Sequence, residues 1–439
     1  MSDERPRLPR ILGAPSAAGV LVGLMIGSGI FRVPSSIAML VETPGAAGLV
    51  WLAGGVLALC GALAVLELTC LYPEAGGVYV FLREAYGKLP AFLYGWTRLL
   101  LLVPASLGAI SLILASYLRT LVPLGAVPDR VVAVVVIATL ALLNYRSLLW
   151  GAALENVVSA AKVIALAVLV VLAFAFGDGS SGALAGPLEF APASWSGFGL
   201  AMVTVMWAYS GWSSSAALAG EVRDPARNMP IAVVGGVGVV VALYVATNAA
   251  YLYLLPIDAM AGSSLVAADA ARRVVGDAGG AVIAVLVVVS TFGAVQAALM
   301  FNPRIFYAMA SDGLLFAPIG RVHSTYLTPH LATLFTAGLG IVYVSLRSFE
   351  QLAQAFILGA WPFEILVVWS VFRLRRLRPD APRPFRVPGY PVVPAVFLCA
   401  TVAMIVNALV QRPGLTLFGF GLILAGLPFY FVATRRLGH

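Results

Sequence analysis

Long apolar runs separated by short polar segments recur along the whole chain, with starts about 30 to 40 residues apart. Each run reaches or nearly reaches the roughly 20 residues that an α-helix needs to cross about 30 Å of hydrocarbon. The pattern therefore predicts twelve membrane-spanning helices. We expect them near residues 15–40, 47–70, 89–118, 131–147, 156–176, 195–220, 231–255, 280–310, 330–346, 351–372, 392–410 and 414–434.

Two of these predicted spans are interrupted in the middle. Gly27, Ser28 and Gly29 interrupt the first span, and Ser210 with Gly211 interrupts the sixth. In hydrocarbon, the backbone groups that such a break leaves free need partners inside the protein. A glycine notch for close helix packing is the alternative for the first span alone. A second break five spans later instead favours an inverted-repeat transporter with its substrate near the bilayer midplane.

An odd number of spans in each block inverts the second block relative to the first, so that the two breaks can meet. We therefore expect an all-α integral membrane protein with twelve transmembrane helices, a 5+5 inverted repeat, and broken helices 1 and 6. The expected parts are an N-terminal segment (1–14), a first repeat (15–194), a second repeat (195–390), and helices 11 and 12 with the C-terminal segment (391–439).

The chemistry of the breaks predicts the kind of ligand. Where the first half-helix ends, at Met25 and Ile26, free carbonyl groups and the negative end of a helix dipole are expected. Where the next half-helix starts, at Ser28, free N–H groups are expected instead. A molecule with a carboxylate and an ammonium a few ångströms apart satisfies both. Further acceptors are expected at the break in the sixth span, from the carbonyls of Trp207, Ala208 and Ser210.

Composition and charge agree with a membrane location. Hydrophobic residues make up 61% of the 439 residues and charged residues only 10%, too little polar surface for a soluble globule of this size. Most basic loop residues fall on one side if the N-terminus is cytoplasmic. The basic loop residues on the other side are Arg119, Arg130, Arg272, Arg273, Arg347 and Arg412. This asymmetry predicts a multi-pass protein of the cell membrane with both termini in the cytoplasm, and it explains the net charge of +8 without a nucleic-acid partner.

Other chemistries find little support in the sequence. The cysteines and histidines show no spacing of a metal site, and no nucleophile with a base or pair of carboxylates is apparent within the spans. We therefore expect no enzyme activity, no cofactor and no metal. A cationic substrate side chain is disfavoured because no acidic residue stands next to either break.

Lys162 is a charged residue within the fifth predicted span, about 9 Å from its start at 1.5 Å per residue. One alternative is that it snorkels towards water. The other is that it faces the bundle, binds carbonyls near Val22 and Gly23, and has Ser290 or Thr291 nearby. In the seventh span, Tyr244 lies on a face suited either to interhelical hydrogen bonds or to the site.

Arg32 follows the first break. It either attracts carboxylates into an outer vestibule or pairs with Glu42 or a lipid headgroup.

Several motifs resemble the amino acid–polyamine–organocation transporter family, and most closely its L-type amino acid transporter branch. They are IGSGIF in the first span, YPEAGGVYVFLREAYGKLPAF after the second, AYSGW and EVRDPARNMP around the sixth, PRIFYAMASDGL at the end of the eighth, PRPFRVPGYPVVP before the eleventh, and GLPFYF in the twelfth.

The resemblance implies a LeuT-like fold and a role for individual residues. The substrate carboxylate would meet the N–H groups of Ser28 and Gly29. The amino group would meet the carbonyls of Met25, Trp207 and Ser210, and the Trp207 ring would act as a lid. By the same resemblance Tyr244 lies near the substrate, and Lys162 takes the place that Na⁺ occupies in sodium-coupled relatives. Ser210 departs from the glycine of eukaryotic members, which narrows the pocket against large aromatic substrates.

We therefore expect a bacterial, sodium-independent secondary transporter of small to medium neutral L-amino acids that works by exchange or facilitated uptake through alternating access. A proton-coupled symporter is the alternative, and a non-transporting amino acid sensor is a more distant one. The expected substrate-binding residues are Met25, Ile26, Gly27, Ser28, Gly29, Ile30, Trp207, Ala208, Ser210, Gly211 and Tyr244, with Lys162 as the ion-site substitute. No disulfide-linked heavy subunit is expected, because residues 119–129 between the third and fourth spans contain no cysteine. Monomer and homodimer both stay open.

Overall fold

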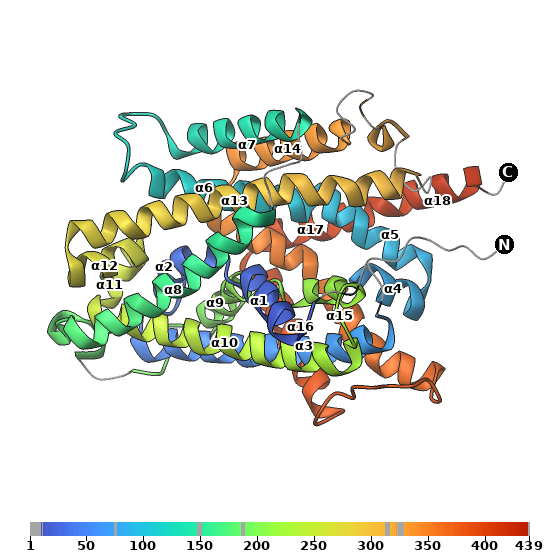
Figure 1. The fold of residues 1–439 in the computed structure, drawn as a ribbon, viewed down its shortest axis with the longest axis horizontal. Coiled ribbons are helices and arrows are strands. Elements are labelled where there is room, and N and C mark those ends of the chain that lie inside the picture. The colour runs from blue at the N-terminus through green and yellow to red at the C-terminus, as the bar shows by residue number, and fades with distance from the viewer. Residues whose placement is uncertain are drawn as a thin grey trace.

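The computed structural model describes residues 10, 12–73, 77–146, 152–185, 189–311, 317–321, 323 and 329–437. Most of the predicted N-terminal segment therefore lies outside the described residues, as do 74–76 and 312–314 of two quoted motifs. The described chain is almost entirely helical, and within it the only β-type pairing is one bridge between Leu12 and Val222 (Figure 1).

The α-helices are bounded as follows: α1 Ala14–Met25, α2 Gly29–Val41, α3 Pro44–Leu71, α4 Val78–Tyr86, α5 Lys88–Thr97, α6 Val103–Leu118, α7 Asp129–Arg146, α8 Ala152–Phe176, α9 Trp195–Ala208, α10 Pro225–Leu254, α11 Ile257–Gly262, α12 Val266–Val275, α13 Asp277–Ser311, α14 His330–Leu346, α15 Phe349–Leu377, α16 Val392–Gln411, α17 Pro413–Leu424 and α18 Gly426–Leu437. A π-helical segment, η1 (Arg98–Leu102), joins α5 to α6. Short 3₁₀ segments are η2 Gly179–Ser181, η3 Ala183–Ala185, η4 Trp212–Gly220 and η5 Ala317–Gly320.

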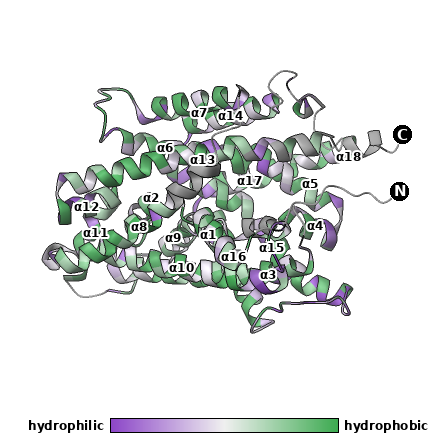
Figure 2. Cartoon of the chain, viewed as in Figure 1, coloured by the Kyte–Doolittle hydropathy of each residue, from purple (hydrophilic) through white to green (hydrophobic). Residues whose placement is uncertain are grey.

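Seven helical stretches among the described residues are long and apolar enough to cross a membrane. The count becomes eight if α1 and α2, which meet at an angle of 46°, form one broken span. The stretch 160–176 of α8, with α9 and α14, is apolar but shorter. Hydrophobic residues line most of these helices in Figure 2. The molecule is thus an all-helical, multi-pass membrane protein, whereas twelve crossings and the inverted repeat stay predictions.

Both interruptions lie where the residue types predict them. In the first, α1 ends at Met25 and α2 begins at Gly29. In the second, α9 ends at Ala208, the chain turns at Gly211 with φ +110°, and it continues as the 3₁₀ segment η4. Only glycine adopts such a positive φ without steric cost, so the position of this turn depends on a single residue.

The molecule has two ends, which we name by their short helices. The α4 end also carries α18, and the α11 end also carries α12 (Figure 1). The sequence pattern did not predict α4, α11 or α12, because these short amphipathic helices lie in segments between the apolar runs. Along the sides, α7 packs on α14 and α3 packs on α10, while α1 and α9 lie in the centre between them (Figure 1).

Candidate functional site

The two broken helices touch at their breaks. A Cβ atom added to Gly29 would lie 2.6 Å from the Cα atom of Ala208. A Cβ atom added to Gly211 would lie 2.8 Å from the carbonyl oxygen of Leu24. Such contacts are possible only where a side chain is absent, so the glycines allow the two backbones to approach each other directly.

Tyr244 of α10 connects the two breaks. Its hydroxyl donates to the carbonyl oxygens of Met25 at 3.1 Å and Ala208 at 3.3 Å, and its side chain is completely buried. Its ring packs edge-on against Trp51, with the centroids 5.7 Å apart. Tyr244 thus lies beside the breaks, where it holds the backbone of the site, and it lines neither of the two cavities described below.

The carbonyl groups at the breaks already accept hydrogen bonds within the protein. The carbonyl of Met25 accepts the N–H of Gly27 at 2.8 Å. The carbonyl of Trp207 accepts both the N–H and the hydroxyl of Ser210, at 3.2 and 2.7 Å. A ligand ammonium would therefore share or replace these internal donors.

The amide groups at the first break differ from the carbonyls. Within the part of the chain that the structure describes, the N–H groups of Ser28, Gly29 and Ile30 have no acceptor. They are the first donors of α2 and carry the positive end of its dipole. This arrangement suits an anionic group such as a carboxylate.

A cavity of about 900 Å³ lies beside the two breaks. Of the predicted site residues it is lined by Met25, Gly27, Ser28, Gly29, Trp207, Ala208, Ser210 and Lys162. Ile26 and Ile30 are completely buried in the hydrophobic core and do not line it. Gly211 lines a second, smaller cavity instead. The structure therefore brings most of the predicted residues together around one space and leaves four of them outside it.

The large cavity extends along α1 and is covered towards the α11 end. On the α1 side its lining includes Ser16 and Gly19, which are exposed, so the cavity reaches the surface there. On the other side the ring of Trp207 packs edge-on against Phe356, with centroids 5.0 Å apart, and contacts Phe349 at 6.4 Å.

Arg32 of α2 strengthens this covered side. Its guanidinium donates to the carboxylate of Glu350 at 3.0 Å and lies over the ring of Phe349, 5.7 Å from the centroid. A second donor lies 3.4 Å from the carbonyl of Ser263, beside α11. Arg32 thus pairs with Glu350 at the start of α15 rather than with the predicted Glu42. The fold brings these two residues together although they lie far apart in the sequence.

Lys162 of α8 is 1% exposed and lines the large cavity together with Val22 and Gly23. A side chain so deeply buried does not reach the molecular surface, which argues against snorkelling. Ser290 and Thr291 do not line the cavity, and the Thr291 hydroxyl donates to Val287 within its own helix at 2.6 Å.

The sequence interpretation missed a charged cluster next to the site. A cavity of about 190 Å³ shares Ser106, Ser210 and Phe356 with the larger one. Its lining includes Arg98 of η1 and Glu364 of α15. The expectation that no acidic residue stands near either break is therefore wrong for this second cavity. A signal was present, because a charged residue within a predicted span is a functional candidate by default.

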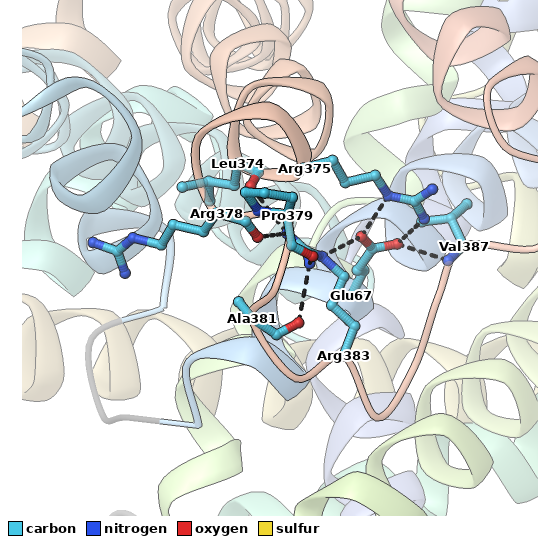
Figure 3. A network of polar contacts seen from close by, with 8 residues as sticks. All are labelled: Glu67, Leu374, Arg375, Arg378, Pro379, Ala381, Arg383 and Val387. Carbon is cyan, nitrogen blue, oxygen red and sulfur yellow. Dashed lines mark hydrogen bonds and ion pairs between the residues drawn. The ribbon is translucent and has the colours of Figure 1, made fainter.

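A separate polar network lies at the α4 end (Figure 3). The buried carboxylate of Glu67 accepts two hydrogen bonds from Arg375, at 2.8 and 2.5 Å, and one from the N–H of Val387 at 2.8 Å. Arg383 lies 3.6 Å from the same carboxylate and donates to loop carbonyls, including that of Ala381. The network ties α3, α15 and the loop before α16 together.

Comparison with known proteins indicates the family to which the chain belongs. The family model described as amino acid permease matches residues 12–433. The serine/threonine exchanger SteT of Bacillus subtilis is 28% identical, with 99% of each chain covered. The b(0,+)-type amino acid transporter 1 of Homo sapiens is 29% identical over 97% of this chain and 88% of its own length. The human cystine/glutamate transporter is 28% identical over 98% and 86%. These relatives are transporters rather than enzymes. They confirm the predicted resemblance to the L-type branch of the amino acid–polyamine–organocation transporters. The chain therefore belongs to the amino acid permease family.

Proposed function

We propose that this permease is a sodium-independent secondary transporter of small to medium neutral L-amino acids that works by exchange through alternating access. The observation that carries the proposal is the row of unpaired N–H groups at Ser28, Gly29 and Ile30, where two broken helices meet beside a cavity of about 900 Å³. These donors suit a substrate carboxylate. Exchange is favoured by the similarity to a serine/threonine exchanger.

The ammonium of the substrate would bind on the other side of the same break. The carbonyls of Met25 and Trp207 are the proposed acceptors, and the ammonium would replace one of the internal donors that each now has. Trp207 would act as the lid, because it lines the large cavity and its ring contacts Phe349 and Phe356 at the covered side. Gly27 and Ala208 complete the proposed contacts.

Sodium independence rests on Lys162. It lines the large cavity together with Val22 and Gly23 near the end of α1, the proposed location of a cation in this architecture. A fixed positive charge there would remove the need for a bound Na⁺.

We also propose the predicted topology. Residues 15–194 and 195–390 would form two inverted repeats, each beginning with a broken span, with both termini in the cytoplasm of a bacterial cell. The described conformation has its cavity open along α1 and covered at the α11 end. In this topology the open side faces the cytoplasm, and alternating access would require the covered side to open in turn.

One experiment tests the transport proposal. The purified chain is reconstituted into vesicles loaded with unlabelled alanine, and uptake of labelled alanine is measured with and without Na⁺ and a pH gradient, against protein-free vesicles. The expected result is uptake that internal alanine stimulates and that neither ion gradient changes. A requirement for Na⁺ would overturn sodium independence. Absence of uptake for every neutral amino acid would overturn the transporter assignment to that substrate class.

Proton-coupled symport is a second candidate, and the carboxylate of Glu364 beside the site favours considering it. Under this alternative, a proton gradient would drive uptake into vesicles without internal amino acid.

A further inference from the structure

The smaller cavity contains two groups of opposite charge that do not pair with each other. Arg98 and Glu364 both line it, yet within the described residues no ion pair joins them. The Nε atom of Arg98 and the Oε2 atom of Glu364 are both buried and without a hydrogen-bond partner. A buried polar group without a partner costs about 1–3 kcal/mol, and more if it is charged. Because both residues line one cavity, the two unpartnered atoms indicate a site that a ligand completes.

Neighbouring residues hold the Arg98 side chain in place. One terminal nitrogen donates to the hydroxyl of Tyr94 at 3.1 Å, and the other donates to the side-chain oxygen of Asn302 at 2.7 Å. The Asn302 amide is itself held by the carbonyl of Ala298 at 2.9 Å. With both terminal nitrogens engaged, the unpartnered Nε donor is fixed in position.

The backbone at Arg98 is also unusual. Arg98 is the first residue of the π-helical segment η1, inside the stretch Lys88–Leu118 that is apolar enough to span a membrane. Short π-helical segments inside α-helices are rare and occur frequently at functional sites. This observation is independent of the unpartnered atoms and points to the same place.

The smaller cavity continues the larger one. Ser106, Ser210 and Phe356 belong to both linings. Ser210 is also part of the break at which the proposed function places the amino acid backbone. A substrate held at the breaks can therefore extend its side chain past these three residues towards Arg98 and Glu364.

The charges define the group that would fit. A carboxylate side chain would be attracted by Arg98 and repelled by Glu364. An ammonium would be attracted by Glu364 and repelled by Arg98. A purely apolar side chain would leave both charged atoms without partners. A primary amide is uncharged, its carbonyl accepts from an N–H donor, and its NH₂ donates to a carboxylate.

We propose that the smaller cavity is a subsite for a primary amide, so that glutamine and asparagine are preferred over apolar and charged amino acids of similar size. The amide carbonyl accepts from Nε of Arg98, and the amide nitrogen donates to Oε2 of Glu364. This inference rests on the proposed function, because it assumes that the substrate backbone binds at the two breaks.

The test compares three substrates of nearly equal size on the unmodified chain. Glutamine, methionine and glutamate compete with uptake of labelled alanine by the reconstituted protein. Glutamine is expected to inhibit at a concentration at least about tenfold below that of methionine or glutamate, since sites built to hydrogen-bond a substrate discriminate strongly against analogues that lack the group. Equal inhibition by glutamine and methionine would overturn the inference.

Two variants test the roles of the charged residues. Glu364→Gln leaves Arg98 as the charged group of the subsite. Inhibition by glutamine should then require about a tenfold higher concentration, and glutamate should become an inhibitor. Arg98→Gln leaves Glu364 as the charged group of the subsite. Inhibition by glutamine should weaken to a similar extent, and lysine should become an inhibitor. Alanine has no group to place in the subsite, so alanine uptake by each variant is the reference against which inhibition by glutamine is compared. Asp129→Asn is the matched control, a carboxylate-to-amide change on α7 outside both cavities, and should keep the glutamine preference.

Failure of the subsite and failure of the proposed function give different results. If alanine is transported but glutamine has no advantage, only the subsite is wrong. If no amino acid is transported, thermal stabilisation of the purified protein by glutamine and by methionine still tests the subsite, and equal stabilisation would refute it. If Glu364→Gln abolishes a response to a proton gradient and leaves the glutamine preference intact, Glu364 carries a proton and the amide subsite is wrong.

Discussion

Gly27 and Gly29 stand two residues apart in the same break, yet the fold surrounds them differently. An added Cβ on Gly29 would lie 2.6 Å from Cα of Ala208, whereas an added Cβ on Gly27 would have nothing within 4 Å. The two positions look alike in the sequence. Only the approach of α9 makes Gly29 a point of contact between the breaks.

The Gly29→Ala variant is accordingly expected to be destabilised, while Gly27→Ala folds normally. The added methyl group at Gly29 meets backbone that cannot move cheaply, which costs about 1–3 kcal/mol. Thermal unfolding of both purified variants in detergent measures the difference. Equal midpoints for the two variants would show that the breaks do not touch as described.

Glu67 and Glu84 form a second informative pair at the residue scale. Each carboxylate interacts with two arginines, but the Glu67 side chain is 2% exposed and that of Glu84 is 24% exposed. Removing the charge of a buried partner leaves the other charges uncompensated. Surface pairs contribute little, because water and ions screen them.

We expect Glu67→Gln to lower the free energy of unfolding by about 3 kcal/mol. The matched change Glu84→Gln should lower it by less than about 1 kcal/mol. Chemical or thermal unfolding of the two variants compares these values. A Glu67→Gln variant as stable as Glu84→Gln would argue against the network at the α4 end as a structural clamp.

At the scale of elements, the break in the first span joins two helices with different tasks. The half-helix α1 lines the open cavity, whereas α2 carries Arg32 to the start of α15. The ion pair between Arg32 and Glu350 and the contact of Trp207 with Phe356 lie on the same side of the cavity. Together these contacts hold α2, α9 and α15 closed over the site.

Breaking that ion pair should favour opening at the α11 end. The two side chains of the pair are 20% and 33% exposed, so its loss should cost about 1 kcal/mol or less. This energy corresponds to at most about a fivefold change in the ratio of open to closed molecules. In a background without native cysteines, Ser106→Cys places a thiol in both cavities. An impermeant thiol reagent applied from the α11 side should react several-fold faster when Glu350→Gln is added.

The control for this measurement is Arg119→Gln. It breaks the pair of Arg119 with Asp129, whose side chains are 36% and 33% exposed and line neither of the two cavities. The reaction rate of the Ser106→Cys thiol should then stay unchanged. An unchanged rate in the Glu350→Gln background as well would mean that the Arg32 pair does not restrain this side.

At the scale of the whole molecule, the proposed topology places the loop between α6 and α7 and the loop between α15 and α16 on opposite sides of the membrane. Val127 and Asp380 are exposed residues in these two loops. In intact cells, an impermeant thiol reagent should label Val127→Cys and leave Asp380→Cys unlabelled until the cells are opened. Labelling of both from outside would contradict the predicted number of crossings.

Local sequence predicted the long apolar helices and the position of the two interruptions. The apolar runs are long enough to identify spans such as 47–70, which the structure has as α3, because the length that crosses hydrocarbon is a property of a single segment. Gly27 to Gly29 and Gly211 interrupt helices because glycine favours non-helical backbone. The sequence was less informative about α4, α11 and α12, whose amphipathic turns lie between the apolar runs.

The sequence by itself therefore determined that this chain is a membrane protein of the amino acid permease family with two broken helices, since length, hydropathy, glycine placement and motifs are local properties. Tertiary structure alone decided which distant groups meet. Arg32 finds Glu350 across 318 positions, Tyr244 joins the breaks, and Arg98 shares a cavity with Glu364. Pairings of this kind depend on how the helices pack together, and no periodicity along a single segment encodes that packing.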